Sequence, residues 1–228
     1  MSRVYLYALL SATPSCEAGM GVCAEPLRVV AVAGLVALVG DVGEVPEPSA
    51  ITLRAQDTVL RRLAAVVDAV LPVRFGTLVA DDAALAESLA PRQPQLARAL
   101  GRVSGCEQMT LRLWGEVTAV PLVPAPPGEV EEGGPGTRYL AGRRRAHDWA
   151  RRVPELEPAR QRLGDLVREE RVERHDRPPL LATVQHLIPR GTSRRYLDDI
   201  DAVRDALRPW RVSVTGPWLA YAFTEDAA

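Results

Sequence analysis

Apolar and polar positions alternate along several stretches of the chain, and a period of two is typical of β-strands. The first stretch, residues 3–10, carries two tyrosines on one face and four aliphatic side chains on the other, Val4, Leu6, Ala8 and Leu10. A continuous apolar run at 27–39, interrupted by a glycine, predicts either two buried strands or one strand with a bulge. Further strands are predicted at residues 73–79, 109–119, 180–188 and 210–214.

Apolar positions that recur every three or four residues predict helices. One such run covers residues 59–71, and Pro72 is expected to end that helix because proline cannot donate a backbone hydrogen bond. Asp81 or Asp82 is expected to cap a helix that reaches Ala90, since aspartate accepts hydrogen bonds from the first free N–H groups. Further helices are predicted at 94–100, at 138–174 with a break at Pro154 and Pro158, and at 198–207.

The order of these elements indicates an α+β fold with two domains. From residue 107 onward the order is strand, long helix, strand, short helix, strand, which is close to a ferredoxin-like layer with helices on one face of a sheet. We therefore expect an N-terminal mixed α/β layer at residues 1–104 and a modified ferredoxin-like domain at 105–228. A segment rich in proline, glycine and glutamate at 121–137 is expected to form a surface loop of the second domain.

Composition narrows the possible functions. Hydrophobic residues make up 47% and charged residues 25% of the 228 residues, which is typical of a globular protein and excludes a disordered chain or a fibre. The 28 basic residues, all arginines, nearly cancel the 29 acidic ones, which argues against a strongly basic nucleic-acid binder and against lysine chemistry. No apolar run reaches the ~18 residues of a membrane span, and no signal peptide is expected.

The histidines and cysteines lack the spacing of a metal site. We expect His147 and His175 to lie on solvated helices and His186 to be a satisfied residue of a sheet. The three cysteines are expected to be reduced thiols, with an exposed regulatory cysteine in the loop at 14–25 as the alternative.

Paired carboxylates are the remaining candidates for acid–base work or cation binding. The pairs Asp81-Asp82 and Asp198-Asp199 stand where helices are predicted to begin, so we expect them to cap those helices. The sequence contains neither a glycine-rich phosphate loop nor a nucleophile motif. We therefore expect no catalytic residue, no metal and no cofactor.

Two local enrichments remain. Twelve arginines between residues 138 and 177 are interleaved with eight acids, which favours ion-paired helix faces, with RNA binding as the alternative. Aromatic side chains gather near the end of the chain, at Trp210, Trp218, Tyr221 and Phe223. Either the last strand closes a core with them, or it offers an edge to another protein.

Four motifs in order along the chain resemble the gas vesicle accessory proteins of the F/L type. They are Tyr5-Leu6-Tyr7-Ala8-Leu9, Leu71-Pro72-Val73-Arg74-Phe75-Gly76-Thr77, Tyr139-Leu140 followed by arginines, and Thr215-Gly216-Pro217-Trp218-Leu219-Ala220-Tyr221-Ala222-Phe223. The chain departs from its relatives at Gln56, where they often carry a histidine.

The resemblance implies a non-catalytic cytoplasmic protein that helps to assemble the gas vesicle. Its expected partners are the hydrophobic shell protein and other accessory proteins, without nucleic acid or membrane. A ferredoxin-like ligand-sensing or RNA-binding module is the alternative, and an enzyme is a third possibility. We predict that the shell subunit is contacted by Trp114, Trp218 and Tyr221.

Six further residues are predicted to be structural parts of the motifs: Pro72, Arg74, Phe75, Gly76, Gly216 and Pro217. The guanidinium of Arg74 could tie its strand to a loop or a carboxylate. Gly76 would permit close approach of the backbone, and Gly216-Pro217 would bend the final strand.

Overall fold

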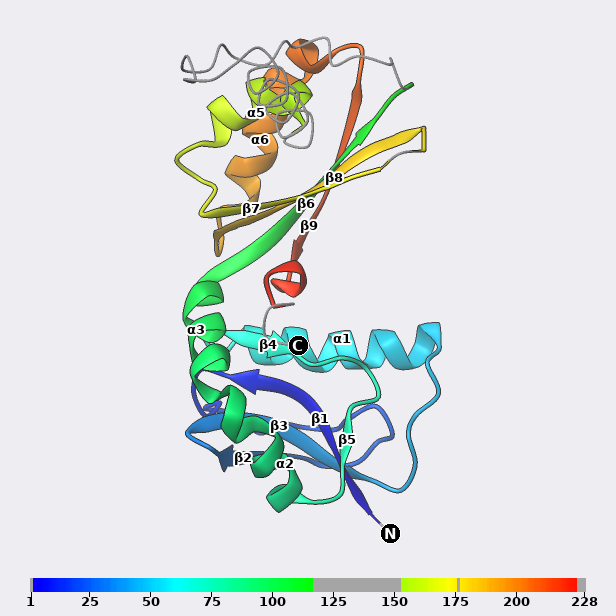
Figure 1. The fold of residues 1–228 in the computed structure, drawn as a ribbon, viewed down its shortest axis with the longest axis vertical. Helices are drawn as coiled ribbons and strands as arrows, with labels where there is room; N and C mark the ends of the chain where they lie inside the picture. Colours follow the sequence, from blue (N-terminus) through cyan, green and yellow to red (C-terminus); the bar gives the residue numbers. More distant parts are fainter. Residues whose placement is uncertain (1, 117–152, 176, 225–228) are drawn as a thin grey trace, which may run out of the picture. The chain divides into compact units, whose positions relative to one another are not determined.

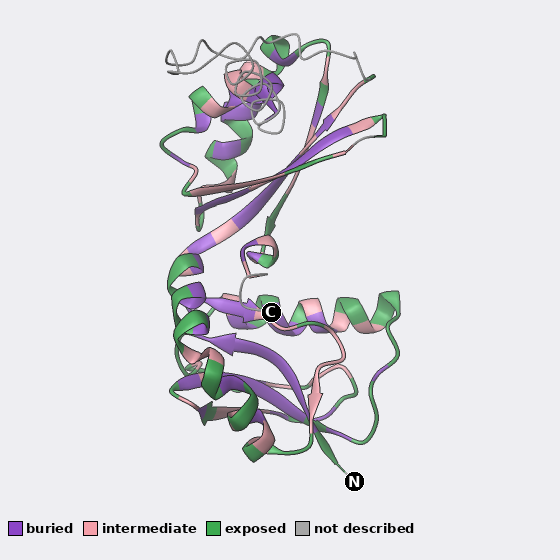
Figure 2. Cartoon of the chain, in the orientation of Figure 1, coloured by how far each residue is buried: buried purple, intermediate pink, exposed green. Residues whose placement is uncertain are grey.

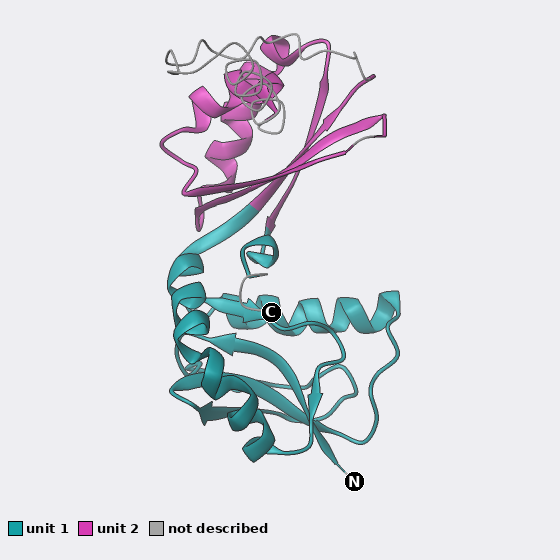
Figure 3. Cartoon of the chain, viewed as in Figure 1, with its two compact units in different colours: residues 1–108, 218–228 teal, residues 109–217 magenta. Residues whose placement is uncertain are grey.

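The computed structural model describes residues 2–116, 153–175 and 177–224 (Figure 1). The chain divides into two compact units, one of residues 1–108 and 218–228 and one of residues 109–217 (Figure 3). Each contains an antiparallel β-sheet and helices, which confirms the predicted two-domain α+β fold. The boundary at 104 stays a prediction, and the predicted loop at 121–137 lies outside the described residues.

The first unit is built on a five-stranded sheet in the order β2-β3-β1-β4, with β5 also paired to β1. Two residues, Ala33 and Gly34, connect β2 to β3 with φ angles of 49° and 73°, as tight hairpin turns require. The apolar run at 27–39 is therefore two strands. The strands are β1 (Arg3–Leu10), β2 (Leu27–Val32), β3 (Leu35–Val42), β4 (Val70–Pro72) and β5 (Leu78–Val79).

Strand β1 changes its register against β3 between Leu6 and Ala8, so Tyr7 is an extra residue in the strand. Beyond this bulge the side chains change faces. Ala8 and Leu10 join the core that contains Tyr5 and Tyr7, and Leu6 points to the other side of the sheet. The predicted face that combined Leu6 with Ala8 and Leu10 is wrong for this reason, because a simple period of two does not allow for a bulge.

Helices cover both faces of the first sheet, whose central strands β1 and β3 are almost entirely buried (Figure 2). Helix α1 packs on the face of the two tyrosines, while α2 and α3 pack on the opposite face. The Asp81 carboxylate accepts the N–H of Ala84 at 2.8 Å, and Pro94 lies in the first turn of α3, as predicted. The helices are α1 (Ala50–Ala64), α2 (Asp82–Leu89) and α3 (Gln93–Val103), with a 3-10 turn η1 (Ala90–Arg92) between the last two.

The helix predicted at 59–71 is misplaced. Helix α1 begins after Ser49, whose side chain caps it, and it ends at Ala64. Residues 70–72 instead form β4 and pair with β1, with Pro72 opposite Ala8. The apolar residues before Pro72 therefore belong to a buried strand, which local periodicity cannot separate from a helix.

The strand predicted at 73–79 shrinks to β5. Residues 73–77 turn, because the N–H of Thr77 donates to the carbonyl of Arg74 at 3.2 Å. Gly76 at φ 84° occupies a conformation that glycine adopts at little cost. The turn places this motif at the end of β4 and joins it to β5 beside β1.

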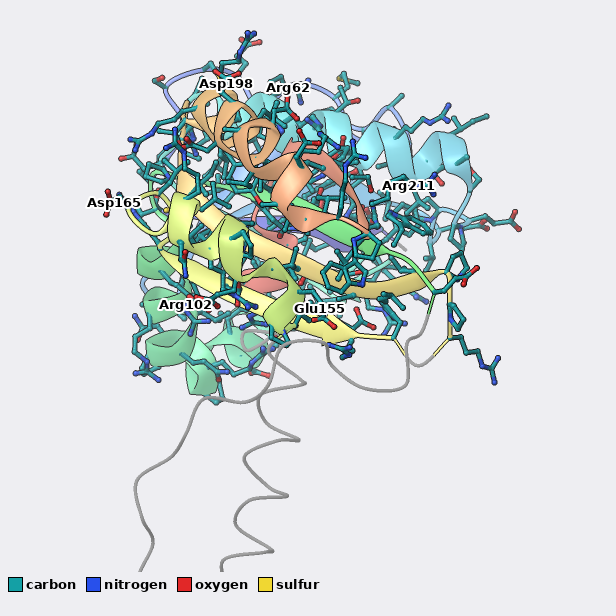
Figure 4. The ribbon with its side chains drawn as sticks, turned by 90° about the horizontal axis from the view of Figure 1, so that it is seen from above. Arg62, Arg102, Glu155, Asp165, Asp198 and Arg211 are labelled. Carbon is teal, nitrogen blue, oxygen red and sulfur yellow. The ribbon has the colours of Figure 1, made fainter. Side chains whose placement is uncertain are left out.

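The second unit has a four-stranded sheet in the order β7-β8-β6-β9, with α5 and α6 side by side on one face (Figures 1 and 4). The sequence β6-α5-β7-β8-α6-β9 with this strand order matches the predicted ferredoxin-like arrangement. The elements are β6 (Cys106–Trp114), η2 (Pro154–Leu156), α5 (Glu157–Leu163), β7 (Glu169–Arg174), β8 (Leu180–Pro189), α6 (Ser193–Val203), η3 (Arg204–Leu207) and β9 (Arg211–Trp218).

The predicted helix at 138–174 fails in its last part, because residues 169–174 form strand β7. Two side chains of this strand, Glu170 and Arg174, form ion pairs with Arg160 and Glu155, which precede it in the chain. Glu155, labelled in Figure 4, is itself buried. Charged side chains thus occupy positions of β7 where the pattern of a strand would contain apolar ones. The sequence of this segment therefore resembles that of a solvated helix, although it forms a strand.

Helix α6 begins at Ser193, five residues before the predicted start at Asp198. The prediction that Asp198-Asp199 cap this helix is therefore wrong. Asp199 is buried in the middle of the helix, and its carboxylate accepts a hydrogen bond from Arg162 of α5 at 2.7 Å. The carboxylate serves to join two helices rather than to begin one.

Candidate protein-binding surface

The end of the chain is anchored in the first unit. Phe223, in the short 3-10 turn η4 (Tyr221–Phe223), is fully buried, and Leu219 packs against the core around α1. The N–H of Ala222 donates to the Gln108 side chain at 2.9 Å. Part of the last motif therefore closes a core, as one of the two interpretations of these aromatics predicted.

Two neighbouring aromatics of the same motif remain open to solvent. Trp218 is 39% exposed and Tyr221 is 38% exposed. The Tyr221 hydroxyl donates to Asp57 of α1 at 3.1 Å, and burial together with this carboxylate raises the pKa of Tyr221. The Arg61 guanidinium lies 5.1 Å from the Trp218 ring centre and pairs with Asp57 at 2.6 Å, so the aromatics are held against the helix.

A hollow of about 480 Å³ lies beside Tyr221. Its walls include Leu53 and Leu60 of α1 and Phe75 of the second motif. Leu53 is 49% exposed and precedes Asp57 by one helical turn. We use the name aromatic surface for Leu53, Asp57 and Tyr221, which line this hollow, together with Arg61 and Trp218 beside them.

A buried tyrosine joins the first two motifs beneath this surface. The Tyr5 hydroxyl donates to Gln56 at 2.7 Å and accepts the N–H of Gly76 at 2.9 Å, and burial raises the pKa of Tyr5. The Gln56 amide in turn donates to the Val73 carbonyl at 3.3 Å, while Phe75 meets the Tyr5 ring edge-on at 6.1 Å. Gln56 is thus a buried connection between α1 and the turn.

Arg74 stands at the exposed tip of the same turn. Its guanidinium has no ion pair or hydrogen bond with any described residue, so the carboxylate partner predicted for it is not found in this part of the chain. Pro72 precedes it inside β4. Arg74 therefore contributes a positive charge to the solvent-facing side of the turn.

The remaining predicted residues belong to the second unit. Trp114 ends β6 half-buried, where its indole N–H donates to Ser213 at 3.0 Å and Arg211 lies 6.0 Å from the ring centre. Gly216 and Pro217 are inside β9, and the Gly216 φ of 133° is rare for residues with a side chain. The structure thus joins Trp218 and Tyr221 in one surface, and gives Trp114 to the other unit.

A polar cluster in the second unit was missed as a group, although His186 was predicted to be a satisfied residue of a sheet. Arg160 forms a double hydrogen bond with the Glu170 carboxylate, and His186 is bonded to both Glu170 at 2.9 Å and Tyr196 at 2.7 Å. Burial favours the neutral acid, but hydrogen bonds from His186 and Arg160 outweigh it and lower the pKa of Glu170 to about 2. Both nitrogens of His186 have partners, so the cluster is a closed structural network.

Other arginines of this unit are also paired with acids. Arg174 binds buried Glu155 at 3.1 Å, and Arg162 binds Asp199 at 2.7 Å. His175 follows a strand instead of lying on a helix, and contacts Thr183 at 2.9 Å. Within the described part of the second unit, these contacts favour the ion-paired interpretation of the arginines. His147 lies outside that part.

Neither metal ligands nor membrane helices are found in the part of the chain that the structure describes. No group of three or more histidine, cysteine, aspartate or glutamate side chains in it is placed to hold a metal ion. None of the described helices is long and apolar enough to cross a membrane.

Comparison with known proteins agrees with the motifs. The family model described as gas vesicle synthesis protein GvpL/GvpF matches residues 3–225. Gas vesicle protein L of Streptomyces sp. (strain CB03234) is 25% identical over an alignment 234 residues long, and the alignment covers 91% of this chain and 86% of that protein.

Solved structures show the same fold. The crystal structure of GvpF from Anabaena sp. PCC7120 superposes with a TM-score of 0.73 at 14% identity, covering 98% of this chain and 96% of that one. GvpF from Microcystis aeruginosa gives a TM-score of 0.72 at 17% identity, with coverage of 97% and 98%. The resemblance predicted from the motifs is confirmed.

Proposed function

Because this chain belongs to the gas vesicle synthesis protein GvpL/GvpF family, we propose that it binds the hydrophobic shell subunit through the aromatic surface and assists vesicle assembly without catalysis. In this proposal it acts in the cytoplasm, at the gas vesicle, together with other accessory proteins. The coarser role, that of a gas vesicle accessory protein, follows from the family itself.

The proposal rests on one observation: in the last motif one aromatic residue is buried, whereas two others are partly exposed. Phe223 is 0% exposed and anchors the segment, whereas Trp218 and Tyr221 expose more than a third of their surface. Large aromatic side chains that are held in place but not buried are typical of binding surfaces, because they lose little conformational entropy when a partner covers them.

The chemistry of the partner suits this surface. A hydrophobic shell subunit exposes apolar area that aggregates in water unless it is covered. The hollow beside Tyr221 is lined mostly by apolar atoms, and Asp57 and Arg74 add charged groups to its lining. An apolar segment of the subunit can therefore insert a side chain into the hollow while water still reaches the charged edge.

The test is co-purification of the shell subunit with tagged variants of the full chain. Trp218→Ala and Tyr221→Ala are expected to reduce the recovered subunit about tenfold each, since aromatic anchors commonly contribute more than 1 kcal/mol to binding. Leu197→Ala, which truncates a similarly exposed apolar residue of the second unit, is the matched control and is expected to bind normally.

Trp114→Ala tests the third predicted contact separately. Thermal melts establish that each variant is folded. Unchanged recovery with folded Trp218→Ala and Tyr221→Ala proteins would refute the proposed surface.

A further inference from the structure

A second hollow lies on the opposite face of the first sheet. It is a groove of about 420 Å³ between the sheet and helices α2 and α3. Leu6 and Leu9 of β1 form its floor, and Leu85 and Leu89 of α2 form part of its wall. The bulge in β1 is what brings Leu9 to this face, so the groove depends on the irregular register of the strand.

Among the residues that the structure describes, the charged ones that line this groove are both arginines, Arg74 and Arg92. The Arg74 guanidinium has neither a hydrogen bond nor an ion pair with the described residues, and the residue is exposed. An arginine at the border of an apolar groove offers a planar set of donors that fits a carboxylate.

The groove and the hollow of the aromatic surface share one border. Pro72, Val73 and Arg74 line both, because the turn at 73–77 lies at the edge of the sheet between its two faces. The groove alone, with leucines of β1, α2 and α3 along it, can take successive apolar side chains of one polypeptide segment, as grooves that bind peptides do.

We propose that this groove binds an apolar segment of a partner protein and that Arg74 pairs with a carboxylate side chain of that segment. The segment carries aspartate or glutamate next to residues that fill the space above Leu6 and Leu9. Arg74 thereby selects among apolar segments, since one with a basic residue at this point meets a like charge at the border of the groove. The partner is a protein, as in the proposed function, but the contact is separate from Trp218 and Tyr221.

Peptide binding tests this inference with the full chain. The probes are labelled peptides of about 15 residues that tile the gas vesicle proteins of the source organism, a length sufficient for either an extended or a helical segment. Each acidic peptide is also made with its carboxylate replaced by the amide. Fluorescence anisotropy is expected to show about tenfold weaker binding of the amide form, as for the loss of a charge-assisted contact.

Variants at Arg74 provide the second arm. Arg74→Glu is expected to weaken the acidic peptides at least tenfold, and to bind better a peptide whose acid has been changed to lysine. Arg74→Gln tests the loss of charge without reversal. Arg98→Glu, an equal charge reversal at an exposed position of α3 outside the groove lining, is the control and is expected to change nothing.

The outcomes separate this inference from the proposed function. Arg74-dependent binding of acidic peptides that persists in the Trp218→Ala variant supports the groove even if the aromatic surface fails its own test. Equal binding of acid and amide peptides, unchanged binding by folded Arg74→Glu, or no peptide binding at all overturns it. Sodium decanoate is included as a small amphipathic carboxylate, and Arg74-dependent binding of decanoate without any peptide also overturns the proposal.

Discussion

Glu170 offers a direct test of how the second unit is held together. Its carboxylate receives hydrogen bonds from Arg160 and His186, and the pKa of Glu170 falls from its ordinary 4.5 to about 2. A group whose folded pKa is depressed stabilises the fold above its unfolded pKa. The contribution is therefore complete above about pH 5 and is lost as the pH falls from about 4.5 to about 2.

The size of the effect follows from the shift. A change of this extent corresponds to about 3 kcal/mol of folding free energy, and the Glu170 side chain is 27% exposed, so solvent screens it little. Glu170→Gln removes the charge but keeps an acceptor oxygen. We therefore expect the free energy of unfolding to fall by about 2 kcal/mol at neutral pH, and by much less near pH 2, where the wild-type carboxyl becomes protonated.

The assay is urea unfolding at several pH values between about 7 and 2.5, followed by hydrogen exchange in β7 and β8 so that the second unit is observed by itself. Glu173→Gln, three residues further along the same strand, is the control because its side chain is 67% exposed. A Glu170→Gln variant that retains the wild-type dependence of stability on pH below 5, or a Glu173→Gln variant that loses as much stability at neutral pH, would contradict this role of the Glu170 carboxylate.

Three further predictions concern the first unit, and urea unfolding measures each. Tyr5→Phe leaves the buried Gln56 amide and the N–H of Gly76 without their hydroxyl partner, and is expected to cost about 1–3 kcal/mol; a neutral result would contradict the network. Gly76→Ala is expected to cost about 1 kcal/mol because φ is 84°, whereas Gly43→Ala, with open space around it, is expected to be neutral. Arg28→Ala loses paired contacts to two aspartates but at a partly exposed site, so about 1 kcal/mol is expected, and Arg28→Lys is not expected to restore it fully.

Local chemistry explains which elements the sequence could predict. The Asp81 cap and Pro94 act within one helical turn, so the starts of α2 and α3 were predicted closely. Residues 180–188 are a long apolar run with strand-forming residues, and β8 was predicted within one residue. In each case the residues that predict the element lie within it or within about ten residues of it.

The predictions are wrong where residues that are distant in the sequence determine the local structure. Residues 70–72 form a strand because they pair with β1. Strand β7 can contain charged side chains because Glu170 and Arg174 form ion pairs with Arg160 and Glu155. The bulge at Tyr7 moves the side chains after it to the opposite faces of the sheet, and no glycine or proline in the strand indicates a bulge there. No local period contains this information.

The candidate surface shows the same division. The last motif predicts Trp218 and Tyr221 as contacts, whereas Arg74 is predicted only as a structural part of another motif. Their proximity could not be predicted, because the Tyr221 hydroxyl meets Asp57 across 164 residues of sequence. Asp57 and Leu53 belong to none of the four motifs, so the sequence does not indicate that α1 contributes to the surface.

The exposure of these aromatics is what the fold alone does not require. Burial of Phe223, packing of Leu219 and the hydrogen bond from Ala222 to Gln108 all fix the end of the chain to the first unit. Replacing Trp218 by a smaller polar residue would leave all three contacts in place and would remove apolar area from water. The 39% of Trp218 that stays exposed while Arg61 holds the ring in position is the area that we propose a partner covers.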